Sequence, residues 1–145
     1  MRHLLAVAAI LGGCASVQPP APVSESAPPP VPAPPAHVET AAVASLMNGA
    51  RADAAAGRLV NAAASLERAL RLEPRNPRLW QELARVRLMQ GDYAQAESVA
   101  ARSNSWAGND SRLRAENWRL IAQAREARGD AAGARAALEA AERQR

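Results

Sequence analysis

The sequence predicts an all-α protein, in which a short solenoid of about three helix-turn-helix repeats follows a disordered, proline-rich linker. Alanine occurs 37 times and phenylalanine never. A core of such small side chains favours closely packed helices over β-sheets, which need branched and aromatic residues. A block of residues recurs after position 40, and most of the prolines precede it.

The predicted repeats lack the residues of most catalytic and metal sites. Both histidines precede position 40, and Cys14 is the only cysteine. This excludes a Cys/His zinc site, a disulfide framework and a histidine-based catalytic triad within the repeats. No pair of carboxylates stands out as a general acid and base, and no glycine-rich loop is placed to hold a phosphate. We therefore predict that the protein is not an enzyme and binds no metal and no small-molecule substrate.

The first residues have the pattern of an exported lipoprotein. Arg2 supplies a positive charge, and residues 4–11 form an eight-residue apolar run, too short to span a bilayer. The sequence LGGC at residues 11–14 resembles the lipobox of bacterial lipoproteins. The resemblance implies a signal peptide over residues 1–13 and a covalent palmitate-containing lipid on Cys14 as the only prosthetic group. Because Ala15 rather than aspartate follows, it also implies anchoring at the periplasmic face of the outer membrane. The alternative is an ordinary signal peptide with a chance cysteine.

Residues 14–40 are predicted to form a tether between this anchor and the repeats. Nine of the 17 residues from 19 to 35 are proline, and no apolar period is present. Repeated proline fixes φ and removes main-chain donors, so such a segment is a semi-rigid spacer. It could hold the domain at a selected distance from the membrane or be a tether of unselected length. A role as a proline-motif ligand is less supported, because no basic residue accompanies the prolines.

The strongest pattern in the chain is an internal repeat. Each copy has a large residue, a small residue four positions later, a glycine 11 positions later and an alanine 16 positions later. These residues are Leu46, Ala50, Gly57 and Ala62; Trp80, Ala84, Gly91 and Ala96; and Trp118, Ala122, Gly129 and Ala134. The copies start 34 and then 38 residues apart. We assign the four additional residues of the longer spacing to the connection at residues 103–110.

This pattern resembles the tetratricopeptide repeat, a pair of helices with a 34-residue period. The resemblance implies a domain over residues 41–145, with repeats at about 43–76, 77–110 and 115–145. The expected helices are 41–56, 59–72, 77–90, 93–105, 112–128 and 131–144. It also implies that the repeated alanines lie where paired helices approach closely. Leu66 and Leu138 should fill equivalent core positions, as should Trp80 and Trp118. The alternative is an irregular helical bundle.

Two further features depart from the usual repeat. Arg87 and Arg125 stand where a tyrosine is common, which predicts altered packing there. Trp106 is a large aromatic residue beside a predicted loop. It could fasten the connection onto the core, or it could be an exposed interface anchor, since tryptophan is enriched among residues that dominate binding.

The repeats are basic, with 17 arginines, no lysine and 12 acidic residues, a net charge of +5. An exported protein meets acidic protein surfaces and anionic wall polymers rather than nucleic acid, although the charge could serve solubility alone. In tetratricopeptide repeats the first helix of each pair lines the concave face. This implies partner-binding positions whose guanidinium and amide groups suit carboxylates and peptide backbone: Arg51, Arg78, Gln81, Arg85, Arg119 and Gln123. The alternative is that these side chains point to bulk water. The spacing of Glu67 and Arg71 predicts an ion pair on the helix surface.

Longer segments resemble one class of these proteins. Residues 72–80 (LEPRNPRLW), 91–93 (GDY), 102–105 (RSNS) and 117–122 (NWRLIA) are similar to tetratricopeptide lipoproteins of the LpoP type. That class activates a bifunctional class A penicillin-binding protein. The resemblance implies that the domain reaches through the cell wall on its tether and stimulates peptidoglycan synthesis. Two alternatives stay open: a scaffold for a pilus secretin or the outer-membrane insertion machinery, and a protein that contacts peptidoglycan directly.

Overall fold

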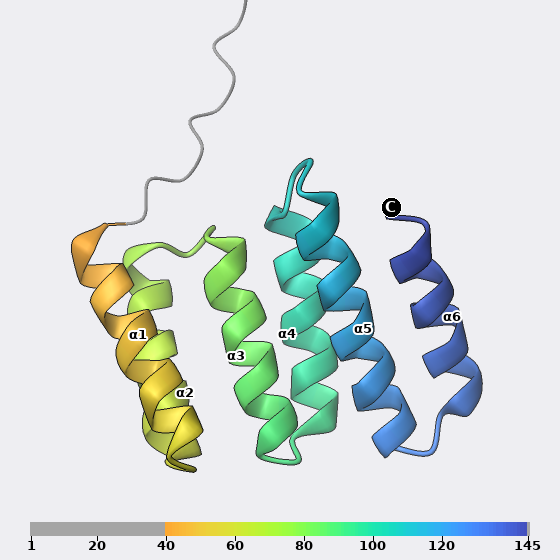
Figure 1. Cartoon of the computed structure of the whole chain (residues 1–145), viewed down its shortest axis with the longest axis horizontal. Helices are drawn as coiled ribbons and strands as arrows, with labels where there is room; N and C mark the ends of the chain where they lie inside the picture. Colours follow the sequence, from red (N-terminus) through yellow and green to blue (C-terminus); the bar gives the residue numbers. More distant parts are fainter. Residues whose placement is uncertain (1–39, 145) are drawn as a thin grey trace, which may run out of the picture. The chain divides into compact units, whose positions relative to one another are not determined.

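The structure is a computed structural model that describes residues 40–144. These residues form six helices: α1 (Ala41–Ala55), α2 (Leu59–Leu72), α3 (Pro77–Met89), α4 (Tyr93–Trp106), α5 (Ser111–Ala127) and α6 (Ala131–Glu142) (Figure 1). The predicted fold class is confirmed, and each helix end lies within two residues of its expected position. The predicted signal peptide, the lipidation site Cys14 and most of the tether lie outside the described residues. Among the helices described, none has the length and apolar character that crossing a membrane requires.

Consecutive helices run in opposite directions and pack in pairs, α1 with α2, α3 with α4 and α5 with α6 (Figure 1). Their boundaries follow from local sequence. Asn76 Oδ1 accepts a hydrogen bond from the Arg78 N–H at 3.0 Å, and Pro77 occupies the first position of α3. Asp110 caps α5 in the same way, through a main-chain N–H of the first turn. α3 ends before Gly91, whose φ of 80° is a conformation that glycine adopts most easily.

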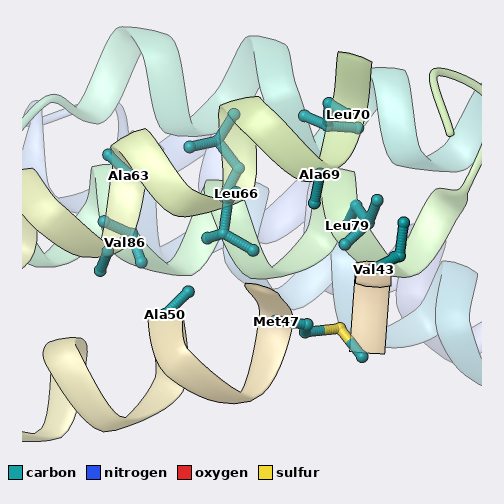
Figure 2. Packing of buried hydrophobic residues seen from close by; sticks show 11 residues of the cluster. Val43, Met47, Ala50, Ala63, Leu66, Ala69, Leu70, Leu79 and Val86 are labelled. Atoms are coloured by element: carbon teal, nitrogen blue, oxygen red, sulfur yellow. The ribbon is translucent and has the colours of Figure 1, made fainter. Parts of the chain in front are cut away.

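The core consists largely of alanine. The alanines that the repeat pattern places between paired helices are all buried, as predicted: Ala50, Ala62, Ala84, Ala96, Ala122 and Ala134. In the first half of the domain, Leu66 of α2 lies among Ala50 of α1 and Val86 of α3 (Figure 2). A second cluster joins α3, α4, α5 and α6 around Ile121. Small side chains thus let neighbouring helices approach closely.

Two expectations about large core residues need correction. Leu138 of α6 is 49% exposed, whereas Leu66 at the equivalent position of α2 is 1% exposed. Leu66 is covered by α3, but the described residues contain no helix after α6 that could cover Leu138. Trp80 and Trp118 pack against the two core clusters yet remain half-buried, so they are only partly core residues.

The four additional residues of the third repeat lengthen a helix rather than the connection at residues 103–110. The connections between pairs are residues 73–76 and 107–110, and their lengths are equal. By contrast, α5 has 17 residues and α3 has 13. Trp80 and Trp118 lie at the same distance from the glycine that follows each helix. The additional residues therefore form one more turn at the start of α5.

Charged residues at the usual tyrosine position form ion pairs between helices. Arg87 of α3 lies 2.7 Å from a carboxylate oxygen of Glu67 on α2, and Arg125 of α5 lies 2.7 Å from one of Glu97 on α4. The predicted change in packing is therefore an exchange of an aromatic contact for a charged one. Because Glu67 pairs with α3, its predicted pair with Arg71 is absent from the described residues.

The buried alanines lead to a stability prediction. Ala96→Leu and Ala134→Leu should each lower the free energy of unfolding by about 1–3 kcal/mol, because a larger side chain overpacks a close helix contact. Thermal denaturation followed by circular dichroism measures the effect. Ala94→Leu and Ala136→Leu are matched controls on the same two helices, since both alanines are exposed. Equal midpoints for buried and exposed variants would contradict the repeat register.

Candidate functional site

A ladder of ion pairs connects the first helices of the three pairs. Arg51 of α1 donates from Nε and Nη2 to Oε1 of Glu82 on α3, at 3.0 and 2.6 Å. Arg85 of α3 donates from Nη2 to Oε2 of Glu116 on α5 at 3.2 Å. The acceptor follows the arginine by 31 residues in both cases, so the pairing recurs with the repeat. Because these side chains are partly exposed, each pair contributes at most about 1 kcal/mol and chiefly orients the arginine.

A polar groove with a volume of about 320 Å³ lies beside this ladder. Its lining comes from α1, α3, α5 and the turn before α5: Arg51, Arg78, Gln81, Glu82, Arg85, Asp110, Arg112, Leu113 and Glu116. The Arg78 side chain is exposed and has no hydrogen bond or ion pair with the described residues. Its guanidinium is therefore available to a carboxylate or a peptide carbonyl that a partner brings.

A smaller apolar pocket of about 140 Å³ shares Arg51, Glu82 and Arg85 with the groove. Its other lining residues are Ala50, Ala54, Leu66, Val86 and Met89. Met89 is 55% exposed, which is unusual for a large apolar side chain. The ion-pair ladder thus lies between a polar and an apolar binding region, an arrangement that suits a peptide with side chains of both kinds.

Four of the six predicted partner-binding residues line this groove, namely Arg51, Arg78, Gln81 and Arg85. Gln81 is nevertheless buried, and its Nε2 donates to Oδ1 of Asn117 at 3.0 Å. Arg119 and Gln123 of α5 are not part of the lining; the first is half-buried and the second is exposed. Because α5 begins one turn earlier than α3, residues of its first two turns occupy the groove instead.

The acidic residues of the groove were missing from the sequence prediction. Glu82 and Glu116 are 34 residues apart, which is the period of the repeat, and this spacing was the signal that could have identified them. Their effect is chemical as well as structural. They neutralise Arg51 and Arg85, so Arg78 is the groove arginine that no carboxylate of the described residues pairs with.

Trp106 is the last residue of α4 and is 38% exposed. The guanidinium carbon of Arg75 lies 5.3 Å from the centroid of its ring. Arg75 belongs to the connection between α2 and α3, so this stacking joins two elements at the surface. Part of the indole stays accessible, and its role as an interface anchor remains a prediction.

Two of the segments that resemble the LpoP type meet in a buried polar network. Asn117 of α5 is fully buried, and its Nδ2 donates to Ser103 Oγ at 2.7 Å and to Asn104 Oδ1 at 3.0 Å. Ser103 Oγ donates in turn to the Pro77 carbonyl oxygen at 2.7 Å. With the bond from Gln81 to Asn117, the network connects α3, α4 and α5 and fixes two walls of the groove relative to each other.

Known proteins share this architecture. The family model of the tetratricopeptide repeat matches residues 53–123. No curated protein matches the chain. Among solved structures, the globular C-terminal domain of LpoP from P. aeruginosa is similar, with 48% sequence identity and a TM-score of 0.70. The match covers 71% of this chain and 97% of that one. At this identity and coverage, the chain belongs to the LpoP-like tetratricopeptide repeat proteins.

Proposed function

We propose that this protein is an outer-membrane lipoprotein whose repeats bind a bifunctional class A penicillin-binding protein and stimulate peptidoglycan synthesis. The repeat fold and the likeness to LpoP indicate a protein-interaction module. The observation that carries the proposal is the 48% identity to the LpoP domain over nearly its whole length. The lipobox-like sequence at residues 11–14 supports the membrane anchor.

The groove offers a physical route to such binding. A segment of the synthase would place a carboxylate or main-chain carbonyl on Arg78 and an apolar side chain against Met89, on either side of the ion-pair ladder. Stimulation requires that the repeats bind an active conformation of the synthase more tightly than an inactive one. Only such differential affinity shifts the population towards the active state.

The test follows glycan-strand synthesis by the host's own bifunctional penicillin-binding protein, from lipid-linked precursor, with and without the full chain. We expect stimulation by the native protein. Arg78→Glu combined with Met89→Asp should weaken half-maximal stimulation about tenfold or more, because one substitution reverses the unpaired charge and the other makes the apolar pocket polar. Arg135→Glu, on the exposed face of α6, is the control.

The outcomes separate the candidate functions. Stimulation that both the native protein and the groove variant produce equally would exclude the groove as the contact surface. Absence of both stimulation and binding would refute the proposal and direct the search to other envelope assemblies, such as a pilus secretin or the outer-membrane insertion machinery.

A further inference from the structure

We infer that a second surface, separate from the groove, binds an acidic segment of a partner protein. We define this surface, the Trp–Arg edge, by Arg75, Trp80, Arg102 and Trp106. It lies on the side of the array where α2 and α4 end and α3 begins (Figure 1). None of the four residues lines the groove, so the inference does not depend on the proposed function.

The four side chains form one interlocked cluster. The guanidinium carbon of Arg75 lies 5.3 Å from the Trp106 ring centroid, and that of Arg102 lies 5.4 Å from the Trp80 ring centroid. Arg102 and Trp106 are four residues apart on α4 and therefore share a face. The Nε1 of Trp80 donates to the carbonyl oxygen of Pro74, next to Arg75, at 2.8 Å. The cluster thus fixes two arginines from different elements beside each other.

Neither arginine of the edge has a carboxylate partner among the described residues. On the opposite side of the array, Arg58, Arg125 and Arg128 each lie within 3.1 Å of a carboxylate oxygen. The Trp–Arg edge therefore presents positive charge that the fold itself leaves unneutralised.

Stacking prepares these guanidinium groups for a carboxylate ligand. A ring holds the flat face of an arginine and restricts its rotamers, while the N–H groups remain free at the rim of the plane. Those N–H groups match the two oxygens of a carboxylate, and the restricted rotamers reduce the entropy lost on binding. The exposed part of Trp106 and the exposed side chain of Leu72, at the end of α2, add apolar contact for the aliphatic stems of acidic residues.

The same geometry argues against a sugar as the ligand. A saccharide would stack on an open indole face, but a guanidinium already covers one face of each ring. Two positively charged groups beside limited apolar surface complement a segment in which glutamate or aspartate alternates with small residues. An acidic peptide is therefore the ligand that this surface fits best.

Fluorescence anisotropy tests the inference with the full chain in detergent. The probe is a fluorescein-labelled peptide of alternating glutamate and alanine, compared with the same peptide carrying glutamine. Arg75→Gln with Arg102→Gln should raise the Kd of the acidic peptide about tenfold. Arg75→Lys with Arg102→Lys keeps the charge but not the planar, two-pronged contact, and should restore only part of the affinity. Arg128→Gln with Arg135→Gln removes the same charge elsewhere and is the control.

The results have distinct meanings. A selective loss in the edge variant, with the control near the native affinity, supports a built site for carboxylates. Equal weakening by both glutamine double variants would show attraction by net charge alone and overturn the inference, as would equal binding of the glutamate and glutamine peptides. Soluble peptidoglycan fragments are tested in parallel. If they bind through Arg75 and Arg102 while the acidic peptide does not, the ligand is a glycan and the inference is wrong.

Discussion

Asn117→Ala should lower the free energy of unfolding by about 3 kcal/mol and the thermal midpoint by about 10–20 °C. Asn117 is fully buried and exchanges hydrogen bonds with Gln81, Ser103 and Asn104. Its truncation leaves a buried amide without an acceptor and removes a donor from two further polar groups. Each unsatisfied buried group costs about 1–3 kcal/mol, and the cavity adds to that cost.

Chemical and thermal denaturation measure this loss directly. Asn109→Ala is the matched control, because Asn109 lies exposed in the turn before the same helix. Its stability should stay within about 0.5 kcal/mol of the native value. If Asn117→Ala were equally harmless, the network could not be what sets the positions of α3, α4 and α5.

Cys14→Ser should abolish lipid attachment. The sulfur is the nucleophile that accepts the lipid, and a serine hydroxyl is far less nucleophilic at neutral pH because it is not ionised. Labelling cells with radioactive palmitate should mark the native protein and leave the variant unlabelled. The variant should appear in the soluble periplasmic fraction or remain uncleaved at the inner membrane.

Ser16→Ala is the control for this experiment, since it changes a neighbouring residue and keeps the cysteine. It should be labelled and fractionate with the outer membrane like the native chain. Continued palmitate labelling of Cys14→Ser would refute the lipoprotein assignment, and would remove the membrane anchor from the proposed function without affecting the repeats.

The helices were predictable from sequence because their determinants are local. The spacing of small and large residues, the cap at Asn76 and the glycine after α3 each act within a few residues. Long charged side chains behave differently, because their partners depend on how helices pack. Glu67 pairs with Arg87 on another helix and not with Arg71 in its own. For the same reason, the sequence identified the arginines of the groove but not the carboxylates that neutralise two of them.

The added turn of α5 was unpredictable for a related reason. Four residues can lengthen either a loop or a helix, and the glycine, asparagine and aspartate at residues 108–110 fit a loop. In the structure, the charged residues of the added turn find partners there: Arg112 bonds to Glu116, and Arg114 donates to Gln144 Oε1 at 2.7 Å. These contacts join the new turn to the groove and to the end of α6.

The length of the insertion also explains why the array tolerates it. Each residue advances an α-helix by about 100°, so four residues rotate the remainder of the helix by about 400°, or only about 40° beyond a full revolution. The inward-facing side chains of α5 therefore keep their phase, and Ile121 and Ala122 still reach the core. An insertion of two residues at the same place would turn them by about 200° and direct them away from α3 and α6. Packing in this array constrains the angular phase of a helix more strictly than its length.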